Sequence, residues 1–266
     1  GDYVTAQGTT LGGDDGIAVA YALAILDSPE IAHPRLEVVI TVSEEVGMEG
    51  ASGIDLSMLQ GYKLLNIDSE EEGVMTVSCA GGNSSICHLP VAYEQADGVQ
   101  LHVAVKGLKG GHSGVEIDKG RANANLVIGR LLLMLERKGH TFGIAALGGG
   151  AKQNAIPREA EVSLVCAAET KDALSATLTE TMTELQHEYA VTDPDLCMEL
   201  SEEPVSGVPV LTQQSARAVS LLVNNLPSGV QAMSANIEGL VETSLNMGIM
   251  ELDEKELHLE FAVRSS

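Results

Sequence analysis

The sequence predicts two regions of different fold class: an α/β portion over residues 1–75 and an α+β domain of two layers over residues 76–266. In the first region a helical segment alternates with short, largely apolar strands, which is typical of a buried α/β sheet. From residue 74 onward, strands with period-two stretches alternate with helices and a hairpin, which is typical of an α+β domain. A chain of 266 residues is long enough to bury a core of this size.

The elements of the first region follow from apolar runs and their boundaries. A glycine-rich stretch over residues 8–16 leads into an apolar segment, 17–26, that predicts a buried helix ended by Pro29. Residues 36–42 are rich in β-branched side chains and predict a strand, as do residues 62–68. Between these two strands we expect a loop and a short helix over residues 47–59.

The second region reads as a repeated succession of strands and helices. We expect helices over residues 121–138, 171–189 and 209–225. We expect strands over residues 74–89, 99–106, 156–166 and 196–200, and a hairpin formed by 242–250 and 257–264 across a polar turn.

Charge and apolar run length exclude several classes of function. The chain carries 38 acidic and 15 basic side chains, a net charge of −23, which repels nucleic acid and anionic membranes. The longest apolar run, 17–26, is shorter than the roughly 20 residues that a membrane span requires. The four cysteines form no Cys-x-x-Cys pair, and we expect buried thiols in a reducing, cytoplasmic compartment.

Two acidic residues, Asp14 and Asp15, stand where the glycine-rich stretch meets the first helix. The simplest interpretation is a helix N-cap, which contributes roughly 1 kcal/mol. A phosphate-binding turn is the second interpretation, but two carboxylates would repel a phosphate group. A divalent cation is the third, because hard oxygen ligands on a tight turn suit such an ion.

Further carboxylates follow the two predicted strands. Glu44 and Glu45 come directly after the first strand, and Asp68 ends the second. Each could be a solvated residue, but ligands of open α/β sheets collect at the carboxyl ends of strands. Adjacent carboxylates in a dry cleft need a cation, so we expect one to bind a metal while the other takes a proton from a water molecule.

Six motifs stand in order along essentially the whole chain: residues 9–16 (TTLGGDDG), 41–48 (TVSEEVGM), 66–73 (NIDSEEEG), 110–114 (GGHSG), 154–160 (NAIPREA) and 242–246 (ETSLN). With these motifs the chain resembles the aminoacyl-histidine dipeptidases (Xaa-His dipeptidase, peptidase D), a branch of the di-zinc metallopeptidases that includes carboxypeptidase G and aminoacylase relatives. The resemblance implies a zinc-peptidase-like mixed sheet in the first region and a lid and dimerisation domain in the second.

The resemblance also implies a role for each acidic residue. Asp14 would bridge two divalent metal ions. We expect these ions to be zinc, with cobalt or manganese as alternatives. Glu44 would be the general base, and Glu45 and Asp68 would each hold one metal. In the lid, His112 would steady the oxyanion, Arg264 would grip the substrate carboxylate, and Asn154 would line the cleft. The plainer interpretations are that His112 is an exposed histidine in a loop and that Arg264 is a surface arginine on a strand.

The implied activity is hydrolysis of Xaa-His dipeptides by a cytoplasmic homodimer that forms through the lid. The family supplies a His-x-Asp motif before residue 1 and a ligand histidine after residue 266, so we expect a fragment that is inactive alone. Ser43 stands where relatives more often carry Asp. Two alternatives stay open: another amide hydrolase (deacylase, carboxypeptidase or tripeptidase), and an inactive paralogue that serves as a dimerisation module. Nucleotide binding by the glycine-rich stretch is the weakest interpretation.

Overall fold

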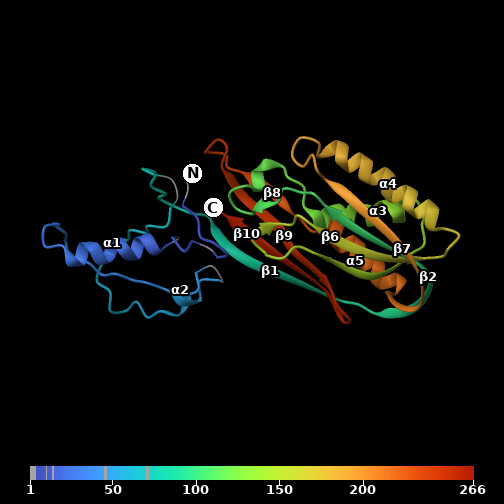
Figure 1. Ribbon diagram of the computed structural model, residues 1–266, viewed down its shortest axis with the longest axis horizontal. Coiled ribbons are helices and arrows are strands. Elements are labelled where there is room, and N and C mark those ends of the chain that lie inside the picture. Colours follow the sequence, from blue (N-terminus) through green and yellow to red (C-terminus); the bar gives the residue numbers. More distant parts are fainter. Residues whose placement is uncertain (1–3, 10, 14, 45–46, 70–71) are drawn as a thin grey trace. The chain divides into compact units, whose positions relative to one another are not determined.

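A computed structural model of the chain describes residues 4–9, 11–13, 15–44, 47–69 and 72–266. Internal contacts divide the chain into two compact units, Gly1–Ser78 and Cys79–Ser266. Each unit is considered by itself (Figure 1).

The first unit holds helices α1 (Gly16–Asp27) and α2 (Glu49–Gly53). Helix α1 confirms the helix predicted over 17–26, and the carboxylate of Asp15 caps it by accepting a hydrogen bond from the backbone N–H of Ala18 at 3.2 Å. The strands predicted over 36–42 and 62–68 are absent, and no described residue of this unit lies in a strand. The mixed sheet expected here is therefore not formed by these residues. A strand needs a partner for its backbone groups, and these segments pair with none, leaving Val42 at 71% and Leu64 at 88% exposure.

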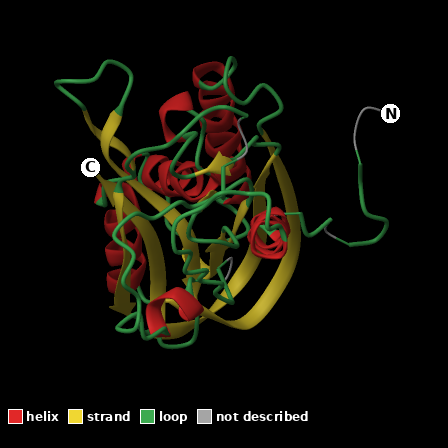
Figure 2. Ribbon diagram, turned by 90° about the vertical axis from the view of Figure 1, so that its left-hand side faces the viewer, coloured by secondary structure: helices red, strands yellow, loops and turns green. Residues whose placement is uncertain are grey.

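The second unit is built on an eight-stranded antiparallel sheet with the order β1-β10-β9-β4-β6-β2-β7, and β8 pairs with β9. Its strands, which curve visibly in Figure 2, are β1 (Gly81–Pro90), β2 (Tyr93–Lys106), β4 (Gly143–Gly149), β6 (Ala160–Cys166), β7 (Cys197–Leu211), β8 (Gly229–Met233), β9 (Val241–Leu252) and β10 (Glu256–Ser265). Two short strands, β3 (Gly111–His112) and β5 (Ala155–Ile156), pair with each other in a separate ribbon. A 3-10 turn, η1 (Ile117–Lys119), follows β3.

Helices form the second layer of this unit. Helices α3 (Ala124–Arg137), α4 (Lys171–Glu188) and α5 (Gln213–Asn225) gather over β2, β4, β6 and β7 (Figure 1). Alternate residues of the strands, such as Leu257 and Leu259 of β10, are fully buried in one core that they share with helix residues such as Leu132. The predicted two-layer α+β domain and its C-terminal hairpin are confirmed.

Several boundaries differ from the prediction. The helix expected from residue 209 begins only at Gln213, because Val210 and Leu211 pair with β2 as the end of β7. Strands β4 and β8 were missed; glycines at both ends of β4 obscure its pattern. All four cysteines are free, but only Cys166 is buried while Cys79 and Cys197 are exposed, so the expectation of buried thiols is wrong for those two. Among the described residues no helix is long and apolar enough to cross a membrane.

Candidate active site

A buried carboxylate fixes both ends of the loop that carries His112. Asp193 is fully buried, and its two oxygens accept hydrogen bonds from the backbone N–H groups of Lys109, at 2.9 Å, and Ala122, at 2.8 Å. A buried charge is stable only when such donors surround it. Sequence reasoning missed Asp193, because no local pattern links it to residues more than 70 positions earlier.

Inside this loop Glu116 holds the backbone of His112. Its carboxylate accepts the His112 N–H at 2.9 Å and forms an ion pair with Arg121 at 2.7 Å. The His112 N–H and the Arg121 guanidinium hold the pKa of the Glu116 carboxyl below its ordinary value. Gly111 has φ +139°, a backbone conformation that favours glycine, and a β-carbon there would displace the side-chain ends of Arg121 and Glu116, the latter at 2.6 Å.

The imidazole of His112 has a defined proton arrangement. Its Nδ1 accepts hydrogen bonds from the backbone N–H groups of Gly114, at 3.1 Å, and Val115, at 3.3 Å. A backbone N–H can only donate, so Nδ1 carries the lone pair and the neutral ring carries its proton on Nε2. The side chain is exposed, which leaves the Nε2–H as a hydrogen-bond donor for a ligand.

Arg264 reaches the same turn from β10. A β-carbon on Gly114 would lie 3.0 Å from Arg264 Nε and 3.0 Å from His112 Cε1, so the two side chains flank this glycine. Arg264 Nε and the hydroxyl of neighbouring Ser113 are both buried, and neither has a hydrogen-bond partner among the described residues. Buried donors without partners are rare in folded proteins and mark places where a ligand can complete the hydrogen bonding.

Asn154 borders the turn through its backbone. Its carbonyl accepts the N–H of Ser113 at 2.8 Å, beside the short β3–β5 ribbon, and its side chain is exposed. Asn246, almost fully buried on β9, donates its amide to the carbonyls of Gln153 at 3.0 Å and Ala155 at 2.8 Å. The structure thus brings His112, Asn154 and Arg264 together, with Asn246 as a support that sequence reasoning did not single out.

The carboxylates predicted to hold metal lie in the first unit. Asp14 and Glu45 are outside the described residues. Glu44 and Asp68 are exposed, and within the described part of the chain they do not belong to a group of three metal-ligating side chains. Asp15 forms the cap of α1.

Comparisons with known proteins show which proteins and which domain family this chain is similar to. Residues 103–193 match the Peptidase dimerisation domain family. The Cytosol non-specific dipeptidase of Escherichia coli is 37% identical over all of this chain and 55% of its own length. An uncharacterised protein of Bacillus subtilis is 31% identical over 60% of this chain and 41% of its own length.

The likeness extends to three dimensions. The crystal structure of an aminoacylhistidine dipeptidase from Vibrio alginolyticus superposes on the whole chain with a TM-score of 0.80 at 38% identity, over 54% of its own length. The chain therefore spans about half the length of these relatives. Along its full length the chain is a relative of the aminoacyl-histidine dipeptidases, and its second unit contains a peptidase dimerisation domain.

Proposed function

We propose that this chain acts in a metal-dependent dipeptidase that hydrolyses the peptide bond of Xaa-His dipeptides. The observation that carries the proposal is the turn at Gly114, which His112 and Arg264 flank while Arg264 Nε stays buried without a partner. A planar guanidinium with unused donors suits the C-terminal carboxylate of a small peptide. The names of the Escherichia coli and Vibrio relatives, both dipeptidases, support the same reaction class.

The acidic residues of the first unit supply the donors that divalent metal ions prefer. Carboxylate oxygens on a glycine-rich turn suit zinc, manganese or cobalt, and the adjacent pair Glu44 and Glu45 is best explained by a cation beside it. In this proposal Asp14, Glu45 and Asp68 would hold the metal ions. When bound, such ions supply Lewis-acid polarisation and a nucleophilic water at neutral pH.

The remaining chemistry belongs to side chains of this chain. Glu44 takes a proton from the attacking water and returns it to the nitrogen of the leaving amino acid. His112 donates its Nε2–H to the carbonyl oxygen as negative charge develops there, since its Nδ1 is already occupied by backbone donors. Arg264 holds the substrate carboxylate, and Asn154 lines the cleft. The loop that carries His112 is fixed in advance by Asp193 and Glu116, so little ordering is needed on binding.

The partners follow from the same comparisons. The match to a peptidase dimerisation domain supports a homodimer that forms through the second unit. A cytosolic location is proposed from the name of the Escherichia coli relative. The net charge of −23 argues against nucleic acid as a partner.

The test is a Glu44→Gln variant of the full-length protein, assayed with Xaa-His dipeptides in the presence of zinc, cobalt or manganese. We expect kcat to fall by about 10²–10⁴-fold with metal content unchanged, because only the proton acceptor is lost. Glu49→Gln, at an exposed acidic residue in the first turn of α2, is the matched control and should keep full activity.

Other outcomes separate the alternatives. Unchanged turnover in Glu44→Gln would show that the base is another residue. Faster cleavage of acylated amino acids or tripeptides than of any dipeptide would favour a different amide hydrolase. Absence of hydrolysis with every metal and substrate would leave the dimerisation module as the function.

A further inference from the structure

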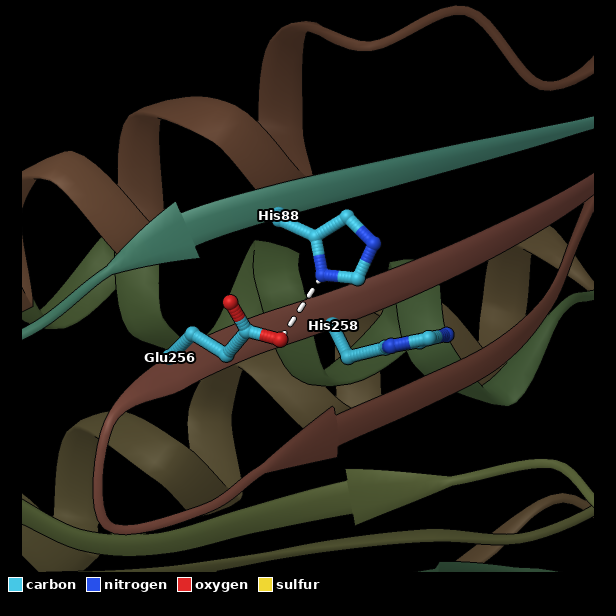
Figure 3. Close-up of side chains that lie close together, drawn as sticks. All are labelled: His88, Glu256 and His258. Carbon is cyan, nitrogen blue, oxygen red and sulfur yellow. Dashed lines mark hydrogen bonds and ion pairs between the residues drawn. The ribbon is translucent and has the colours of Figure 1, made fainter.

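A second group of metal-ligating side chains lies in the second unit, on the face of the sheet opposite the core. His88 of β1 stands directly across the ladder from His258 of β10, and Glu256 lies two residues before His258 on the same face (Figure 3). Leu257 and Leu259, which alternate with these residues, are fully buried in the core. The sheet register therefore gathers two imidazoles and a carboxylate on one exposed surface.

The three side chains are in contact. His88 Nδ1 donates to Glu256 Oε1 at 2.7 Å, the contact drawn as a dashed line in Figure 3, and the rings of His88 and His258 meet edge to face with centroids 4.9 Å apart. One ligand atom from each of the three residues lies within 4.8 Å of the others. Tetrahedral zinc, with bonds of about 2.0–2.1 Å, places its ligand atoms roughly 3.3 Å apart, so small side-chain movements suffice.

A fourth residue prepares His258 for coordination. Glu260 lies two positions beyond His258 on the same face, and His258 Nε2 donates to its carboxylate at 2.9 Å. This fixes the proton on Nε2 and leaves the Nδ1 lone pair unprotonated. A carboxylate that orients a metal-ligating histidine through its other nitrogen is the usual outer support of a protein metal site.

We infer that His88, Glu256 and His258 bind a divalent transition-metal ion of the zinc class, with Glu260 as the orienting carboxylate. On binding, His88 changes tautomer: its proton leaves Nδ1 and a proton from solvent occupies Nε2, so the Nδ1 lone pair and Glu256 Oε1 are both available to the ion, and water completes the coordination. Two imidazoles and a carboxylate form a donor set that selects zinc over calcium or magnesium. The strongly acidic chain favours the approach of cations to this surface.

The bound ion would cross-link the edge strand of the sheet. Strand β1 is the outermost strand at this side, and it begins shortly after the boundary between the units at residues 78 and 79. A metal between β1 and β10 stabilises the strand that leads in from the first unit. The site uses none of the carboxylates assigned to hydrolysis, so it does not rest on the proposed function.

The experiment titrates the whole chain with zinc against a chromophoric chelator, after Asp14→Asn, Glu45→Gln and Asp68→Asn have removed the first-unit carboxylates. We expect one zinc ion per chain, with affinity at least 10-fold weaker in His88→Asn or His258→Asn. Glu260→Gln should weaken binding about 10-fold, which is typical of an orienting residue. Cobalt, used as a spectroscopic probe, should give visible absorption bands that the histidine variants lose.

The matched control is His102→Asn, because His102 is a similarly exposed histidine that forms an ion pair with Glu161 at 3.5 Å but, among the described residues, belongs to no group of three metal-ligating side chains. It should keep the zinc affinity of its parent. Equal affinity in the His88, His258 and His102 variants, or no stoichiometric zinc in the parent, would overturn the inference. Urea unfolding of the metal-free variants checks folding, and Glu256→Gln, which keeps the shape of the side chain, is an independent test of the same site. Dipeptide hydrolysis is scored separately, so failure of one proposal is distinct from failure of the other.

Discussion

Replacement of Asn246 by alanine tests whether a buried amide supports the loop that borders the candidate active site. Its Nδ2 donates to the carbonyls of Gln153 and Ala155, and its Oδ1 accepts a longer hydrogen bond from Asn123 at 3.4 Å. Because Asn154 lies between those two carbonyls and contacts Ser113, loss of the amide loosens the segment beside His112.

The magnitude follows from the two carbonyls that lose their donor. Each acceptor left unpaired out of water costs roughly 1–3 kcal/mol. Gln153 and Ala155 are half-buried rather than fully buried, so water replaces part of each bond. We therefore expect Asn246→Ala to lower the free energy of unfolding by about 2–4 kcal/mol. Asn246→Asp should cost more at neutral pH, because it faces two carbonyl oxygens with a charged acceptor, and should recover in acid as the new carboxyl gains a proton.

Urea unfolding of the second unit, followed by far-ultraviolet circular dichroism, measures this change. The matched control is Asn225→Ala, since Asn225 is exposed at the end of α5 and its amide donates to Leu221 of the same helix. We expect the control to change stability by less than about 0.5 kcal/mol. An Asn246→Ala variant as stable as the control would refute the idea that this amide holds the loop.

Two further predictions concern the same loop. Gly111→Ala should lower the free energy of unfolding by about 1–3 kcal/mol, because its positive φ favours glycine and the new β-carbon displaces the Arg121–Glu116 ion pair. Gly139→Ala, also at positive φ but with open space around it, separates the backbone strain from the displaced ion pair in the same urea assay. Glu116→Gln should destabilise the protein at pH 7 and lose its effect in acid. The pKa of Glu116 is lower in the folded state than its unfolded value of about 4.3, so its stabilisation is present above that value and disappears as the pH falls through the folded pKa. A difference between Glu116→Gln and wild type that stays constant from pH 7 to pH 3 would contradict this account.

Local patterns determined much of the second unit. The hairpin of β9 and β10 could be predicted because its apolar residues alternate, and α3 and α4 because their apolar residues recur at helical spacing. The same patterns failed for residues 36–42 and 62–68, since β-propensity describes a pleated surface in contact with neighbours and these segments have no strand beside them. The glycine and histidine of the 110–114 motif were recognisable because turn chemistry is local.

The sequence by itself therefore determined the two-layer class of the second unit, the turn at His112 and the acidic clusters that suggest metal chemistry. Only the tertiary structure decided which distant residues meet. The fold sets Arg264 beside Gly114 and lets Asp193, in the connection between α4 and β7, hold both ends of one loop. The pairing of β1 with β10 joins His88 to Glu256 across 168 positions. Each contact depends on how the fold places distant segments, and no local pattern encodes that choice. For His88 and Glu256, a register shift of one residue would turn the side chains of the strand to the other face.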